Sequence, residues 1–252
     1  MALFRPFSAL FATLLLAGPF ALSAADTALT VEVIVAKARA ALTSDVAALD
    51  KVKILRMEFK AFDDKGKELN TSTLTLAVPG YRLQQTNDRD RGLEAVVCAG
   101  RLDGWTTNRT DALARRSVRS VPYEEFKKLQ DMSRDDLAFF ALPAAGLGTA
   151  TYKGPSDIDG RKTQAVEYAY ASGFRITRHF DAATFVLVAS DQPTPQGELQ
   201  RQKIEALTKV DGIAFPSKES IFVDGKKSGD VTYDQIQVNP ALPAGLFDFP
   251  TF

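Results

Sequence analysis

Apolar and polar residues alternate along most of this chain with the period of two that is typical of half-buried β-strands. In "KILRMEFKAF", for example, Leu55, Met57 and Phe59 fall on one side and charged residues fall on the other. The same alternation occurs in "TSTLTLAV", "YRLQQT", "TQAVEYAY", "FRITRHF" and "DVTYDQIQV". Short turn-forming sequences separate these segments, which indicates an antiparallel meander.

Asp-Gly pairs mark three of the expected turns, at 159–160, 211–212 and 224–225. Asp-Gly between alternating runs is a strong signal for a two-residue β-hairpin. Several strands at this short spacing predict a curled sheet or barrel rather than separate small sheets.

Two segments change to the helical period. Between 30 and 49 apolar residues recur at Val31, Ile34, Val35, Ala38 and Leu42, and Thr30 can cap the start, so we expect one amphipathic helix. The sequence from Pro122 to Leu142, "PYEEFKKLQDMSRDDLAFFAL", predicts one or two short helices that Pro143 ends. The fold class is therefore α+β and mainly β.

The N-terminal residues resemble a secretory signal peptide. Arg5 precedes an apolar run from Phe7 to Leu22, and small residues follow it. A membrane anchor is the alternative, but Gly18 and Pro19 break a run that is already short for a helix of roughly 20 residues. We expect cleavage after Ala24 or Ala25, without a lipid anchor because no Cys stands there, and a single domain over 26–252.

The composition supports a periplasmic protein with a sizeable core. Hydrophobic residues make up 45% of the chain, and Cys98 is the only cysteine, so no intrachain disulfide can form. Lys and Arg number 31, as do Asp and Glu, so the net charge gives no reason to expect a nucleic-acid partner.

Catalytic chemistry has little support in the sequence. His179, the only histidine, alternates with Arg175 and Thr177, so we expect it to face outward from a strand, and Cys98 is expected to pack as a small apolar residue. We find no metal-ligand spacing, nucleophile elbow, P-loop or dinucleotide motif, and we predict no catalytic, cofactor-binding or metal-binding residues. A hydrolase would have to use His179 or Cys98.

A basic stretch, "NRTDALARRSVRS", contains Arg109, Arg115, Arg116 and Arg119. It could contact a lipid headgroup, an anionic membrane or an acidic partner. A solvated loop is the simpler interpretation, because Asp111, Glu124 and Glu125 dilute the charge.

The order of these segments resembles the LolA-like family of periplasmic lipoprotein carriers and outer-membrane lipoprotein receptors. The resemblance covers nearly the whole chain after the signal peptide. It rests on "ILRMEFKAFDDKGKELNTSTLTLAVPGYRLQQT", "AVVCAGRLDGWTTN", a helical insert, "VDGIAFP" and the closing "VNPALPAGLFDFP". One departure stands at Val78, where carriers of the family have a basic residue before the Pro that helps to latch their lid.

The resemblance implies an unclosed antiparallel β-barrel of about 10–11 strands with helices covering its concave face. It also implies a non-catalytic carrier for an acylated lipoprotein, lipid or other hydrophobic ligand, monomeric and in transient contact with the membrane. The terminal segment would tuck Leu246, Phe247 and Phe249 against the barrel.

Large apolar residues are the candidates for a ligand cavity on the concave face or its helical cover. They are Met57, Phe59, Leu74, Leu76, Trp105, Phe139, Phe140, Tyr168 and Tyr170. The alternative is a filled core, in which case the same fold would serve as a protein-interaction or envelope-stress sensor module.

Overall fold

The computed structural model describes residues 29–88, 92–109 and 117–250, so the predicted signal peptide lies outside the described part. Thirteen strands form one antiparallel sheet in these residues. The N-terminal strands are β1 Ile54–Asp63, β2 Glu68–Ala77, β3 Gly80–Asp88, β4 Leu93–Ala99, β5 Gly104–Arg109 and β6 Ser117–Ser120. The C-terminal strands are β7 Gly148–Ile158, β8 Arg161–Tyr170, β9 Arg175–Asp181, β10 Leu187–Pro193, β11 Leu199–Val210, β12 Ile213–Val223 and β13 Lys226–Val238.

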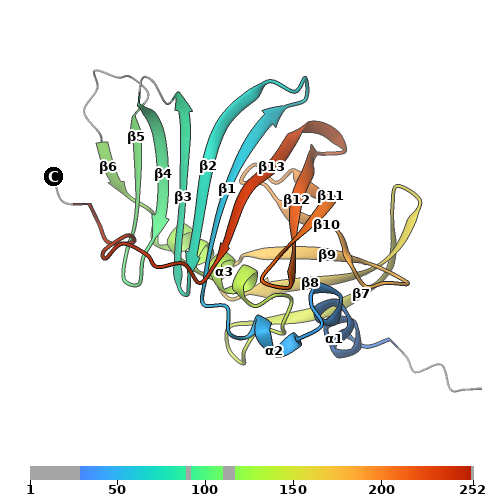
Figure 1. Cartoon of the computed structure of the whole chain (residues 1–252). Coiled ribbons are helices and arrows are strands. Elements are labelled where there is room, and N and C mark those ends of the chain that lie inside the picture. The colour runs from blue at the N-terminus through green and yellow to red at the C-terminus, as the bar shows by residue number, and fades with distance from the viewer. Residues whose placement is uncertain (1–28, 89–91, 110–116, 251–252) are drawn as a thin grey trace, which may run out of the picture.

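The sheet is open, with β6 and β7 at its two edges and the β1–β13 pair near its middle. It curves around helix α3 (Tyr123–Leu137), which connects the two edge strands in sequence (Figure 1). The predicted fold class is confirmed. The strand number, thirteen, exceeds the expected one partly because β6 has four residues, too few for alternation to reveal it.

The Asp-Gly pairs form the predicted hairpin turns. Asp211 and Gly212 have φ of 51° and 78°, and the pairs at 159–160 and 224–225 are likewise positive at both residues. This is the backbone of a type I′ turn, whose twist matches that of the flanking strands. Asp tolerates the left-handed region and Gly adopts it freely, so these pairs set the register of β7–β8, β11–β12 and β12–β13.

The expected helix over 30–49 is two helices, α1 (Val31–Leu42) and α2 (Val46–Leu49). Thr30 caps α1, as predicted, by accepting from Val33 N at 3.4 Å. The break falls at 43–45, where Asp45 accepts from Ala47 N at 3.1 Å and starts the second helix. Asp and Thr favour such caps over helix interiors, which explains why apolar spacing alone missed the interruption.

Helix α3 ends at Leu137, earlier than the expected stop at Pro143. Phe139 and Phe140 follow it with φ of 46° and 68°, a conformation that costs a bulky residue free energy. Both rings are buried, and they point into different halves of the core. Phe139 packs on Phe215 with ring centroids 6.0 Å apart, whereas Phe140 packs on Phe180 at 5.1 Å.

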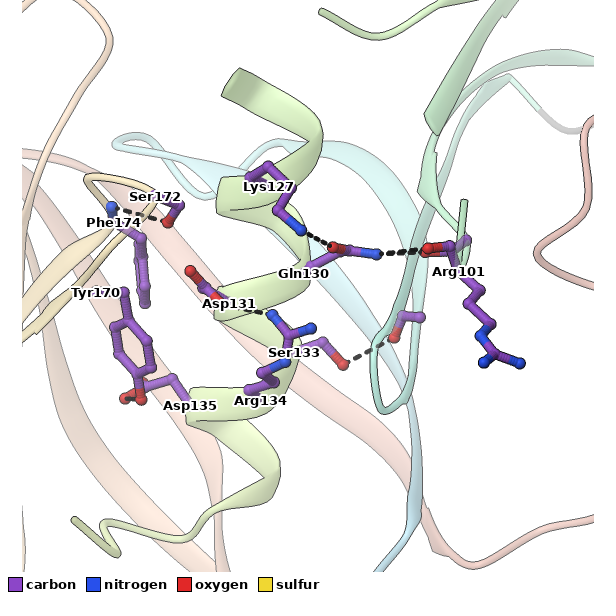
Figure 2. Close-up of polar contacts among 12 residues, drawn as sticks. Arg101, Lys127, Gln130, Asp131, Ser133, Arg134, Asp135, Tyr170, Ser172 and Phe174 are labelled. Atoms are coloured by element: carbon purple, nitrogen blue, oxygen red, sulfur yellow. Dashed lines mark hydrogen bonds and ion pairs between the residues drawn. The ribbon is translucent and has the colours of Figure 1, made fainter. Parts of the chain in front are cut away.

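Side chains on α3 bind both halves of the sheet (Figure 2). Toward the N-terminal strands, Ser133 Oγ donates to the Gly80 carbonyl at 2.7 Å and Gln130 Nε2 to the Gly100 carbonyl at 2.8 Å. Toward the C-terminal strands, the Tyr170 hydroxyl donates to Asp135 Oδ1 at 2.8 Å. The helix therefore fixes the curvature of the sheet.

The C-terminal segment returns along the lower ends of β2–β5 in Figure 1. Asn239 Oδ1 accepts from Lys53 N at 2.7 Å and Ile54 N at 3.1 Å, which ties the end of β13 to the start of β1. Phe247 packs on Trp105 and Cys98, whereas Phe249 is exposed. The expected docking of this segment is confirmed for Phe247 and is wrong for Phe249.

Candidate functional site

A continuous row of half-buried apolar side chains crosses five strands on the side of the sheet that faces α3. Strand pairing places Met57 opposite Ile236 and Leu74, Leu74 opposite Leu83, and Leu83 opposite Val97. At roughly 4.8 Å between neighbouring strands the row is about 19 Å long. We call these five residues the apolar row: Ile236, Met57, Leu74, Leu83 and Val97.

The apolar row is half-buried because α3 covers the row beside it. Two residues away along four of the five strands lie residues that are buried in the same cluster as Phe126, Leu129 and Leu137 of α3: Leu55, Leu76, Tyr81 and Ala99. The residues of the apolar row pack against that cluster but keep contact with solvent. An apolar ligand lying along the row would remove this surface from water, which favours binding by about 25 cal/mol per Å².

The predicted cavity residues divide between this exposed surface and a filled core. Met57 and Leu74 belong to the apolar row, and Phe59 lies next to it on the same face. Leu76 is fully buried beneath α3. The remaining predicted residues on this side are buried in the core around α3 and the C-terminal strands: Phe139, Phe140, Tyr168 and Tyr170.

Trp105 does not share a space with the others, so its predicted grouping with them is wrong. It pairs with Cys98, which pairs with Arg82, and these residues alternate with the α3-facing Ala99 and Tyr81. Trp105 therefore lies on the outer face, where Phe247 covers it and its Nε1 donates to the Phe247 carbonyl at 3.4 Å. The sequence could place Trp105 on a strand, but a short hairpin did not reveal which face it occupied.

A buried ion pair anchors α3 to the C-terminal strands. Arg178 donates through Nη1 to Asp135 Oδ1 at 3.0 Å and through Nη2 to Asp135 Oδ2. Its guanidinium also lies over the rings of Phe140 and Tyr168, 5.2 and 4.9 Å from their centroids. Burial alone would lower the pKa of Arg178. The charge and hydrogen bonds of the Asp135 carboxylate raise it and outweigh burial, so the pKa lies above its ordinary value and the pair stays charged.

A second polar group, which the sequence analysis missed, lies near the β13 end of the apolar row. The Glu219 side chain accepts a hydrogen bond from the Tyr233 hydroxyl at 3.0 Å, and Tyr233 packs on Phe59 with centroids 5.4 Å apart. Glu219 is 7% exposed, and burial raises its pKa to about 7. Its position in "SKESIFV" gave no sequence signal, because a Glu on an alternating strand normally faces solvent.

His179 faces away from α3, as alternation predicted, but it is 6% exposed rather than at the surface. Its Nδ1 lies 2.9 Å from Ser156 Oγ and its Nε2 lies 3.0 Å from Asp191 Oδ2. These groups have the residue types of a nucleophile–base–acid set. The Ser156 hydroxyl also hydrogen-bonds to Thr163 Oγ1 at 2.7 Å, and Arg201 donates to both carboxylate oxygens of Asp191 at 2.7 Å. Because each group has a second partner, we interpret the set as a structural hydrogen-bond network that connects β7 to β11.

Cys98 is buried, as expected, and burial raises the pKa of its thiol to about 12. A thiol held neutral in this way is a poor nucleophile or metal ligand. In the described residues no group of three or more His, Cys, Asp and Glu side chains is arranged to hold a metal ion. No helix among them is long and apolar enough to cross a membrane.

Of the basic stretch, Arg115 and Arg116 lie outside the described residues, and Arg119 is exposed on β6. The outer face carries a hollow of about 510 Å³ lined by Glu58, Lys60 and Thr71 among others. Its charges are partly paired, with Lys60 Nζ 3.2 Å from Glu68 Oε2, and it lies on the opposite face from the apolar row. We therefore place the candidate site at the apolar row.

Three solved structures share this fold over 87% of the chain. The first is a DUF1329 family protein from Desulfovibrio piger, with 14% identity, a TM-score of 0.54 and 97% of that chain covered. The second is a LolA superfamily protein from Nitrosomonas europaea, with 12% identity, a TM-score of 0.53 and 98% of that chain covered. The third is a domain from Vibrio parahaemolyticus that is assigned as an outer membrane lipoprotein-sorting protein, with 14% identity, a TM-score of 0.53 and 96% of that chain covered. At these identities the likeness shows the fold, and the expected resemblance to LolA-like structures is confirmed at that level. No family model and no curated protein matches the chain.

Proposed function

We propose that the protein is a non-catalytic binding or carrier protein of the bacterial periplasm that holds an acyl chain along the apolar row. The observation that carries the proposal is the row itself, an apolar surface about 19 Å long at ordinary strand spacing, left half-exposed beside a core that α3 covers completely. Monomeric soluble proteins rarely leave a continuous apolar surface open unless it binds something.

The fold it shares with a LolA superfamily protein and a lipoprotein-sorting domain supports this proposal. In this proposal residues 1–25 direct export and are removed, residues 26–252 form the mature domain, and the monomer meets membranes transiently. Its ligand is a lipid or an acylated envelope lipoprotein. Val78 occupies the position at which carriers of the family have the basic residue that helps to latch their lid, and it is 56% exposed. Release of the ligand would therefore not depend on such a latch.

A protein-interaction or sensor module is the second candidate. The observation that favours it is the filled core of the C-terminal half, where Phe140, Tyr168 and Phe180 pack in one buried cluster with residues of α1. In that case the apolar row would be covered by a partner protein rather than by an acyl chain.

Native mass spectrometry of the mature protein, purified from periplasm, distinguishes the two candidates. We expect a lipid to co-purify with the wild type. Leu74→Gln should reduce the lipid occupancy by about tenfold, because burying the Gln amide under an alkyl chain costs roughly 1–3 kcal/mol of binding free energy. Thr73→Gln is the matched control, because it lies next to Leu74 on the same strand but on the outer face.

Equal lipid loss in both variants would mean that the strand, not its inner face, was disturbed. A wild type that carries no lipid and binds no added alkyl ligand would overturn the carrier proposal and favour the interaction module.

A further inference from the structure

The acidic group beside the apolar row lacks a cation of its own. Among the described residues no salt bridge involves Glu219, and only burial and the Tyr233 hydrogen bond act on its pKa. Carboxylates that proteins remove from water are normally paired with a cation or a metal. The charged form of Glu219 therefore has no cationic partner among the described residues, and a bound ligand could supply one.

The free oxygen of this carboxyl group reaches solvent. Glu219 Oε2 accepts from Tyr233, and no hydrogen bond to Oε1 occurs in the described residues. Glu219 Oε1 is not among the described side-chain atoms that are closed to solvent and lack a hydrogen bond. It therefore touches solvent, although the residue as a whole is only 7% exposed.

Glu219 lies on the side of the sheet that faces α3, because it pairs with Val231, which pairs with Ala61 on the same face of β1 as Phe59. Asp136 on α3 is close enough for the Glu219 charge to raise its pKa, after the larger effects of burial and of Asp135. The Asp136 side chain is 41% exposed. A second acidic group therefore lies near Glu219 at the surface of α3.

Strand geometry places Glu219 and its neighbours near one end of the apolar row. Phe59 lies two residues beyond Met57 on the same face of β1, and Tyr233 pairs with it from β13. Glu219 reaches the pair from β12, the next strand. A carboxylate beside two aromatic rings is suited to an ammonium group, which donates hydrogen bonds to the carboxylate and is attracted to ring faces.

We propose that Glu219, Tyr233 and Phe59 bind the ammonium head of an amphiphile whose alkyl chain lies along the apolar row. The inference rests on the proposed function, because it assigns the head of the ligand whose chain that function requires. Asp136 on α3 is the other acidic group near Glu219, and Arg178, 3.9 Å from Asp136, is held by Asp135. The charges near Glu219 therefore favour a cationic head.

Isothermal titration calorimetry with three probes of equal chain length tests the assignment: decylammonium, decanol and decanoate, all below their micelle concentrations. At pH 8 we expect the wild type to bind decylammonium about tenfold or more tighter than decanol, and decanoate weaker than both. Glu219→Gln should remove the preference and change decanol binding by less than about twofold, because the amide keeps an acceptor for Tyr233.

The preference should also fall with pH. Since burial raises the pKa of Glu219 to about 7, the carboxyl is mostly neutral at pH 5.5 and mostly charged at pH 8. Two titratable groups interact with it. Burial and Glu219 hold the pKa of Tyr233 well above 10, and burial, Asp135 and Glu219 raise the pKa of Asp136 on α3 to about 7 against the lowering effect of Arg178, so both carboxyl groups lose charge toward pH 5.5. Decylammonium binding should therefore weaken at pH 5.5 in the wild type, and decanol binding should not.

Glu58→Gln is the control, because Glu58 precedes Phe59 on the same strand but faces outward. It should keep the preference. Equal binding of decylammonium and decanol by the wild type, or the same loss in both variants, would overturn the inference and leave the carrier proposal standing. A wild type that binds none of the three probes would overturn both.

Discussion

Glu219 shows, at the scale of one residue, how a buried carboxyl group can act against stability. The fold removes its carboxyl group from water, and a single neutral hydroxyl, that of Tyr233, compensates. Because its folded pKa of about 7 lies above the ordinary 4.5, the unfolded chain ionises first as pH rises. The group therefore reduces stability progressively between about pH 4.5 and pH 7, and the loss is complete above pH 7.

Glu219→Gln should accordingly stabilise the protein at high pH. The shift corresponds to about 3 kcal/mol at pH 8 and to a difference near zero at pH 4.5. Urea unfolding of both proteins at the two pH values measures it. Glu205→Gln, at an exposed site with no salt bridge among the described residues, should change stability by under about 0.5 kcal/mol at either pH. A stabilisation of equal size at pH 4.5 and pH 8 would show that the carboxyl is not the cause.

His179 is the residue-scale counterpart outside the site. Truncation by His179→Ala should destabilise the protein by about 1–3 kcal/mol, because Ser156 and Asp191 lose a buried partner. Thermal unfolding measures the loss, and hydrolysis of a simple ester, assayed alongside, tests the hydrolase alternative. An unchanged melting temperature, or an ester hydrolysis that disappears with His179, would contradict the structural interpretation.

At the scale of an element, buried polar contacts hold the C-terminal end of α3 in addition to its apolar face. Arg39 of α1 donates to the carbonyls of Ala138 and Phe139 at 2.6 and 3.1 Å, which satisfies groups left unpaired at the end of α3. Asp135, in the last turn of α3, and Arg178 bind the helix to β9. Three elements thus meet where the chain leaves the helix.

Asp135→Ala should cost about 3–5 kcal/mol, since it leaves the buried Arg178 guanidinium without its carboxylate. Lys162→Ala breaks an ion pair with Asp157 in which both side chains are exposed, and it should cost under about 1 kcal/mol. Urea unfolding of the two variants gives the comparison. Similar losses in both would show that the Asp135–Arg178 pair adds little to the attachment of α3.

At the scale of the whole molecule, the first and the last strand of the chain, β1 and β13, pair in the middle of the sheet. The β1–β13 pair joins the N-terminal and C-terminal strands, and Asn239 ties that junction to Lys53 and Ile54. The segment beyond it covers the outer face of β4 and β5 through Phe247. This cover, and not the concave face, determines the environment of Trp105.

Phe247→Ala should expose Trp105, the only tryptophan, and shift its fluorescence emission to longer wavelength. Phe249→Ala should leave the emission unchanged, because Phe249 is already exposed. The same measurement separates the two faces: alkyl ligands bound along the apolar row should not alter Trp105 emission directly. A large emission change on adding decanol to the wild type would contradict the placement of the ligand.

The sequence by itself determined the local pattern of this protein. Period-two alternation identified the strands and gave Met57, Phe59, Leu74 and Leu76 their common face, because side chains on a strand must alternate. The Asp-Gly pairs fixed three hairpins, because few residues tolerate a left-handed turn. These features depend on neighbours in the chain, and so they could be predicted without the fold.

Only the tertiary structure decided which face was covered and by what. Trp105 and Phe247 pack together although they are far apart in the sequence. Phe139 and Phe140 are adjacent in the sequence but enter two different core clusters, because α3 ends between the two halves of the sheet. The burial of His179 and Glu219 likewise depends on neighbouring strands, which supply Ser156, Asp191 and Tyr233 as partners. Alternation tells which side of a strand a residue takes, but the packing of other elements decides whether water reaches that side.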